Sequence, residues 1–165
     1  MAKCTCKILG ETGAISGYLK LSQSSEDAPT IIEGQISGLA PGKHGISVNT
    51  YGNIIGVEGT SSSDKRVTSE CGPIFNPMGK NHGAPQDEER MMGDLGNLLV
   101  GEDGICSVFI EDKVLKLIGP HSVIGRSVVL YAGEDDCARG GNELSLKTGN
   151  SGARIAAGVI GLAAS

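Results

Sequence analysis

The chain has 165 residues with a formal net charge of −5, 26 glycines, 39% hydrophobic residues and 3% aromatic residues. A chain of this length buries a substantial core as one domain, and its acidic balance argues against nucleic acid or an anionic membrane as a partner. Because no apolar run reaches the ~20 residues of a membrane span and the N-terminus lacks a signal-peptide core, we expect one cytoplasmic domain, residues 1–165.

Nine short segments show strand-like patterning, with turn residues such as Gly, Pro and Asp between them. No segment shows sustained helical periodicity, so eight or nine strands predict an antiparallel sandwich or barrel. The predicted strands cover Cys4–Leu9, Ala14–Ser22, Thr30–Ser37, His44–Thr50, Asn97–Val100, Cys106–Glu111, Val114–Leu117, Val128–Tyr131 and Ala156–Gly161.

The cysteines are five in number and form no C-x-x-C pair, which fits a reducing compartment. Cys4 and Cys6 fall on one face of the first predicted strand, and we expect them to be structural thiols.

Two long stretches interrupt the strands, residues 51–96 and 132–154. Long ordered loops in a compact domain are usually functional. Within the first stretch we expect the polar octet GTSSSDKR (59–66) to be a mobile tip. We expect the charged piece QDEER (86–90) to be a solvated turn.

The second half of the chain carries specific strings in a fixed order. They are GPIFNP (72–77), HGAPQDEER (82–90), GDLGN (93–97), IGRSVV (124–129), DDCARGGNE (135–143), KTGNSGAR (147–154) and GVIGLA (158–163). With GKHG (42–45), they closely resemble the copper/zinc superoxide dismutase family, and the resemblance runs from Cys6 to Ala163. It implies an all-β, eight-stranded Greek-key β-barrel, related to an immunoglobulin-like sandwich, with the metal site between the two long loops.

The resemblance places the family's four copper histidines at Ser47, Asn49, Ile74 and Tyr131, here called the four copper positions. None of them is histidine, and their side chains are poor copper ligands beside imidazole. Dismutation needs a metal that cycles between two oxidation states. We therefore expect no bound copper and no dismutase activity, that is, a pseudoenzyme.

The family's zinc ligands are kept in part. The resemblance assigns zinc-ligand positions to His82 and Asp94, while Ile74 and Met91 occupy the other two. Because a firm zinc site needs about four ligands in tetrahedral array, we expect weak zinc binding at most and no other cofactor.

Two further residues match family positions around the metals. Asp135 matches the aspartate that links the two metal sites, and Arg154 matches the arginine that guides superoxide to copper. We expect Asp135 to orient His82 and Arg154 to hold its loop on the barrel. The family's disulfide is absent, because Ala157 stands where one cysteine is expected and leaves Cys71 without a partner.

The family dimerises through apolar segments that this chain largely keeps. Gly52, Ile124 and Leu162 match them, which predicts a homodimer or a heterodimer with a dismutase-like subunit. Lys7 stands where an apolar residue is usual, and it places like charges near the two-fold axis of a homodimer.

Three functions remain for comparison. The first is a non-catalytic homologue that acts by binding an active dismutase or another partner. The second is residual dismutase activity with metal at an altered site, made by His82, Asp94 and Cys71 or Tyr131. A chaperone-like role is disfavoured, because no MxCxxC-type module and no C-terminal C-x-C is present.

Overall fold

The structure is a computed structural model that describes residues 1–10, 13–54 and 69–164. The predicted mobile octet 59–66 lies outside the described residues. These described residues form eight strands, one short 3-10 helix and one helical turn. They are β1 (Ala2–Gly10), β2 (Ser16–Gln23), β3 (Thr30–Ser37), β4 (Gly42–Asn49), η1 (Ser69–Cys71), β5 (Asp94–Val100), β6 (Ile105–Asp112), β7 (Ser127–Tyr131), α1 (Ser145–Thr148) and β8 (Arg154–Leu162).

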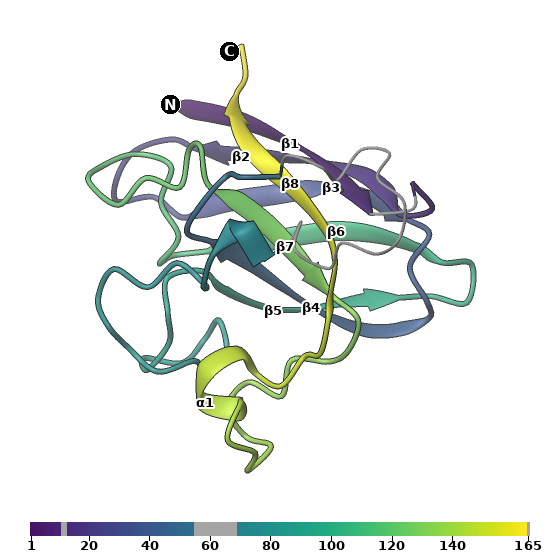
Figure 1. Cartoon of the computed structure of the whole chain (residues 1–165). Coiled ribbons are helices and arrows are strands. Elements are labelled where there is room, and N and C mark those ends of the chain that lie inside the picture. Colours follow the sequence, from purple (N-terminus) through teal and green to yellow (C-terminus); the bar gives the residue numbers. More distant parts are fainter. Residues whose placement is uncertain (11–12, 55–68, 165) are drawn as a thin grey trace.

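The strands form one antiparallel sheet in the order β5-β4-β7-β8-β1-β2-β3-β6. Its two ends, β5 and β6, lie in contact, so the sheet curls into a nearly closed barrel (Figure 1). This order confirms the predicted eight-stranded Greek-key β-barrel. The part of the first long loop that follows η1, the second long loop and α1 lie at one end of the barrel, and both termini lie at the other (Figure 1).

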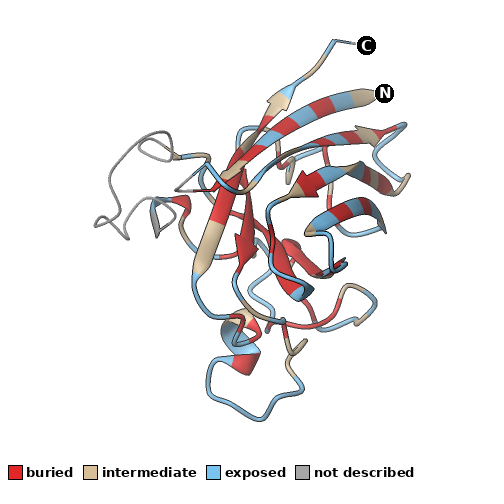
Figure 2. Cartoon of the chain, turned by 90° about the vertical axis from the view of Figure 1, so that its right-hand side faces the viewer, coloured by how far each residue is buried: buried red, intermediate tan, exposed pale blue. Residues whose placement is uncertain are grey.

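Inward-pointing and outward-pointing side chains alternate along the strands, and the inward-pointing ones form the barrel core, as expected for strands with one face exposed to solvent. Along β1, Cys4, Cys6 and Ile8 point inward and are buried, while Lys3 and Lys7 are exposed; Figure 2 shows the resulting stripes. The two thiols are therefore core residues, as predicted.

Strands β4 and β7 differ, because both of their faces are buried. Every residue of β7 is buried, as are the last six of β4. Loop segments cover the outer face of these strands: Phe75 N–H donates to Val48 O at 2.9 Å, and Gly93 N–H donates to Phe75 O at 2.9 Å. Polar side chains on this face are thereby removed from water.

The predicted strand Val114–Leu117 is wrong. Its backbone bonds to side chains rather than to a strand: Asp112 Oδ1 accepts from the N–H groups of Val114 and Leu115, and Thr30 Oγ1 donates to Leu115 O. Gln23 Oε1 accepts from Leu117 N–H at 2.8 Å. The alternating pattern arises because Leu115 and Leu117 are buried against the core, and burial alone does not make a strand.

The expectation of a solvated turn at residues 86–90 is wrong for Arg90. Arg90 is buried, and its Nη1 donates to Asp112 Oδ2 at 2.7 Å and to Pro85 O at 2.7 Å.

Within the described residues, no helix is long and apolar enough to span a membrane.

Candidate functional site

The four copper positions come together on the covered face of β4 and β7. Ser47 and Asn49 are two apart on β4, and Tyr131 is the last residue of β7. Ile74 reaches them from the first long loop, where it forms an isolated antiparallel bridge with Asn49. All four are buried. The strand pairing thus juxtaposes positions that lie far apart in sequence.

Three of these side chains form a closed hydrogen-bond network. Ser47 Oγ donates to Asn49 Oδ1 at 2.6 Å, and it lies 3.0 Å from Tyr131 Oη. Because the only hydroxyl hydrogen of Ser47 is donated to Asn49, the hydroxyl of Tyr131 is the donor in the second hydrogen bond. Asn49 Nδ2 donates to Gly72 O at 2.8 Å. The buried polar atoms satisfy one another, as stable interiors require.

A second cluster lies beside this network and is centred on His82. Its Nδ1 is 2.6 Å from Asp94 Oδ1 on β5, and its Nε2 is 2.7 Å from Asp135 Oδ1 in the second long loop. Asp94 Oδ2 also accepts from the N–H groups of Gly83 and Met91. His82 and Asp94 are fully enclosed, so this is a buried charged triad.

Both ring nitrogens of His82 face carboxylate oxygens, which accept hydrogen bonds, so both nitrogens donate and the ring is an imidazolium. Burial alone lowers the pKa of His82. The hydrogen bonds and charges of Asp135 and Asp94 outweigh this effect and raise the pKa to about 9. The positive ring joins two carboxylates that would otherwise repel one another.

The second long loop is folded tightly around this triad. Asp135 and Asn97 exchange two hydrogen bonds, Asn97 Nδ2 to Asp135 O at 2.9 Å and Asp135 N–H to Asn97 Oδ1 at 2.7 Å. A side chain at Gly149, which ends α1 with a φ of 71°, would overlap the carboxylate of Asp135. The backbone N–H of His82 donates to the backbone carbonyl oxygen of Leu146 at 3.0 Å. The triad therefore ties both long loops to the barrel.

The sequence of the chain matches a known family. The family model described as copper/zinc superoxide dismutase (SODC) matches residues 15–160 of the chain. The chain belongs to the copper/zinc superoxide dismutase family.

The residues at the dismutase copper positions do not fit copper. Ile74 offers no donor atom, and Ser47, Asn49 and Tyr131 present neutral oxygens and an amide nitrogen instead of imidazole. Their hydrogen bonds to one another would have to break before any of them turned to a metal.

At the dismutase zinc positions only His82 and Asp94 carry side chains of the kind that bind zinc, which is fewer than the four ligands of a firm site. In the structure both ring nitrogens of His82 lie within hydrogen-bond distance of carboxylate oxygens. Met91 contributes its backbone N–H to Asp94 rather than a ligand atom. Among the described residues, no group of three or more His, Cys, Asp or Glu side chains is arranged to hold a metal ion.

The position of the dismutase substrate-guiding arginine lies close to the copper positions. Arg154 is the first residue of β8, it is half-buried, and it pairs with Tyr131 across the β7–β8 ladder. The two residues that the resemblance assigns to the family's disulfide also lie together. Cys71 and Ala157 belong to one buried cluster with Tyr131, and the Cys71 thiol lies 3.6 Å from Asn53 O.

Two ion pairs around the site were not predicted from the sequence. Arg90 pairs with Asp112 inside the protein, and Arg139 pairs with Asp87 at 2.9 Å, which links the two long loops at the surface. Their partners lie 22 and 52 residues away. No local pattern signals such pairs, because only the barrel brings these segments together.

Proposed function

We propose that this member of the copper/zinc superoxide dismutase family binds no copper, does not dismutate superoxide, and acts by binding another protein. The observation that carries the proposal is the network at the four copper positions. A metal that bound here would first have to break the hydrogen bonds of Ser47, Asn49 and Tyr131, each of which contributes about 0.5–1.5 kcal/mol.

Retention of the scaffold supports a binding role. The His82 triad and the Arg139–Asp87 pair hold the two long loops through contacts between side chains. A barrel whose loops are held in this way still presents the outer surfaces through which the family assembles. We expect no cofactor, and zinc binding no tighter than weak.

The face that we propose for a partner surrounds Gly52, Ile124 and Leu162. Leu162 is 76% exposed and Tyr51 59% exposed, both high values for large apolar side chains. A Cβ on Gly52 would overlap Gly125 O, so glycine is required where these two segments meet. An apolar surface of this kind fits a dismutase-like subunit, either a second copy or a different chain.

The first test is metal content and turnover. The purified protein is loaded with copper and zinc, dialysed, and assayed for bound metal and for superoxide dismutation beside an active dismutase. We expect substoichiometric copper and turnover no faster than buffer. Stoichiometric copper with dismutase-like turnover would support residual activity instead and overturn the proposal.

The second test addresses the partner. Labelled protein is mixed with an active dismutase, and subunit exchange is followed by sedimentation, with Leu162→Asp as the matched variant. We expect a mixed dimer that this substitution abolishes. No mixed species at any ratio contradicts the proposed pairing, whether or not the first test succeeds.

A further inference from the structure

The outer surface of β1, β2, β3 and β6 forms a regular wall whose charges are unevenly distributed. Strand registers place Thr5, Lys20, Glu33 and Phe109 in one row across the four strands. The neighbouring row is Lys3, Ser22, Ile31 and Glu111, and the row on the other side is Lys7, Tyr18, Gln35 and Ser107. We call this surface the outer wall.

The two halves of the outer wall carry opposite charges. Lys3, Lys7 and Lys20 lie on β1 and β2, whereas Glu33 and Glu111 lie on β3 and β6. Within residues 1–10, 13–54 and 69–164, none of these five forms an ion pair. All five are exposed, so their charges remain available to a partner.

Two aromatic side chains stand among these charges. Tyr18 is 52% exposed and Phe109 is 68% exposed. Aromatic residues are only 3% of the sequence, so two of them on one wet surface are conspicuous. Exposed aromatic rings beside charged groups are typical of protein interfaces.

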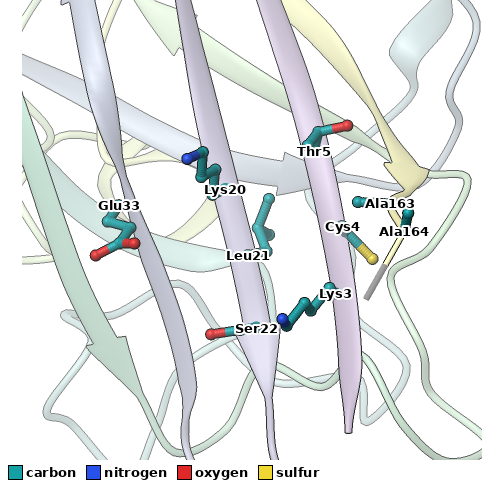
Figure 3. A pocket seen from close by; sticks show the side chains of 9 residues that line it. All are labelled: Lys3, Cys4, Thr5, Lys20, Leu21, Ser22, Glu33, Ala163 and Ala164. Carbon is teal, nitrogen blue, oxygen red and sulfur yellow. The ribbon is translucent and has the colours of Figure 1, made fainter.

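The outer wall is hollowed on both sides of the Lys20–Glu33 row. A hollow of about 280 Å³ lies between Tyr18 and Phe109, and one of about 370 Å³ extends past Lys3 towards Ala164. Lys20 and Glu33 border both hollows. Figure 3 shows the second one, with Lys3 and Lys20 on adjacent strands and Glu33 on the next. Side chains of a partner can therefore enter on either side of the charged row.

We infer that the outer wall binds the outer wall of a second copy of this chain. The two copies are related by a two-fold axis that lies between the two facing sheets, runs parallel to the strands, and passes over the gap between β2 and β3. Such an axis lays β2 of one copy over β3 of the other at the same height along the strands. Lys20 then faces Glu33 of the second copy, and Lys3 faces its Glu111, each pair occurring twice. Packing two sheets with nearly aligned strands is a common arrangement.

The charges favour a second copy over other partners. A purely acidic or purely basic partner would meet like charge on one half of the outer wall. A two-fold axis perpendicular to the strands would place Lys20 over Tyr18 and Thr5 over Lys7, which pairs no opposite charges. The axis parallel to the strands therefore gives the best match.

The size of the outer wall predicts a weak contact. Four strands spaced about 4.8 Å apart and eight residues rising about 3.4 Å each cover roughly 500 Å² in projection. This is below the ~800 Å² per partner of a stable interface, so we expect micromolar or weaker association. Because its ion pairs are exposed, the contact should weaken with added salt.

The outer wall borders the Gly52 face at β1, so a test must separate the two contacts.

The test is molar mass by light scattering over a rising concentration series. Variants Lys20→Glu and Glu33→Lys each place like charges face to face twice, and we expect the dissociation constant to rise at least about tenfold in either. When the two single variants are mixed, a Lys20→Glu chain can pair with a Glu33→Lys chain, and opposite charges then face one another at both contacts. We therefore expect the mixture to associate as the wild type does, through mixed pairs. The double variant should also associate.

The control variant is Lys147→Glu, at an exposed position on α1. It changes the net charge of the chain by the same amount as Lys20→Glu and should leave association unchanged. Leu162→Asp removes any contribution of the Gly52 face without touching the outer wall. The inference is overturned if molar mass does not depend on concentration. It is equally overturned if the single variants associate as well as the wild type, or if their mixture does not regain association.

Discussion

Replacing His82 by glutamine probes whether the buried imidazolium stabilises the barrel. In the metal-free wild type, the ring donates to Asp94 at 2.6 Å and to Asp135 at 2.7 Å. Glutamine is similar in size but carries no charge, so the two carboxylates would face one another without a cation. Removing one partner of a buried ion pair typically costs about 3–5 kcal/mol.

The pKa gives a second estimate of this cost. A pKa of about 9 in the folded chain, against 6.5 for the ordinary side chain, corresponds to about 3–4 kcal/mol at about 1.4 kcal/mol per pH unit. The folded pKa is the higher one. The stabilisation is therefore fully present below pH 6.5 and is lost as the pH rises through about 9. The two estimates agree, and we expect a loss of about 3 kcal/mol.

Equilibrium urea unfolding of EDTA-treated protein measures the effect. We expect His82→Gln to lower the free energy of unfolding by about 3 kcal/mol at pH 6, and the difference from wild type to shrink above pH 9. His121→Gln, in a surface turn, is the matched control and should change little. A loss below about 1 kcal/mol at pH 6, or an equal loss at pH 6 and pH 10, would refute the reasoning.

Further substitutions test the rest of the site. Replacing all four copper positions by histidine should give stoichiometric copper binding, measured by metal analysis and electron paramagnetic resonance, because the fold already brings these positions together; no copper uptake contradicts this. Ala157→Cys should form a disulfide with Cys71 on oxidation and raise stability by up to about 4 kcal/mol for a roughly 90-residue loop, measured by unfolding with and without reductant. Burial, with the charge of Asp135, raises the pKa of Cys137 to about 11. Its alkylation rate should therefore climb through pH 10 without levelling, and a plateau near pH 8 argues otherwise. Asp112→Asn leaves Arg90 buried without a countercharge and should cost about 3–5 kcal/mol in urea unfolding, whereas a neutral result means that solvent reaches the pair.

Local patterns in the sequence predicted most of the barrel. Thr30–Ser37 matches β3 at both ends, and seven other strands were found with shifted bounds. Alternation works here because it is a local consequence of one buried strand face. The same signal failed at Leu115 and Leu117, where two buried residues pack under a turn whose backbone bonds to Asp112, Thr30 and Gln23.

The sequence by itself determined which donor atoms are available at the dismutase copper positions, because residue identity alone decides that no imidazole is present. Only the tertiary structure decided what those residues do instead. Ser47 and Tyr131 are 84 residues apart, and His82 finds its carboxylates 12 and 53 residues away. Hydrogen-bond partners at such separations are set by how the strands pair and the loops close. The closed polar network and the buried imidazolium are therefore properties of the folded barrel.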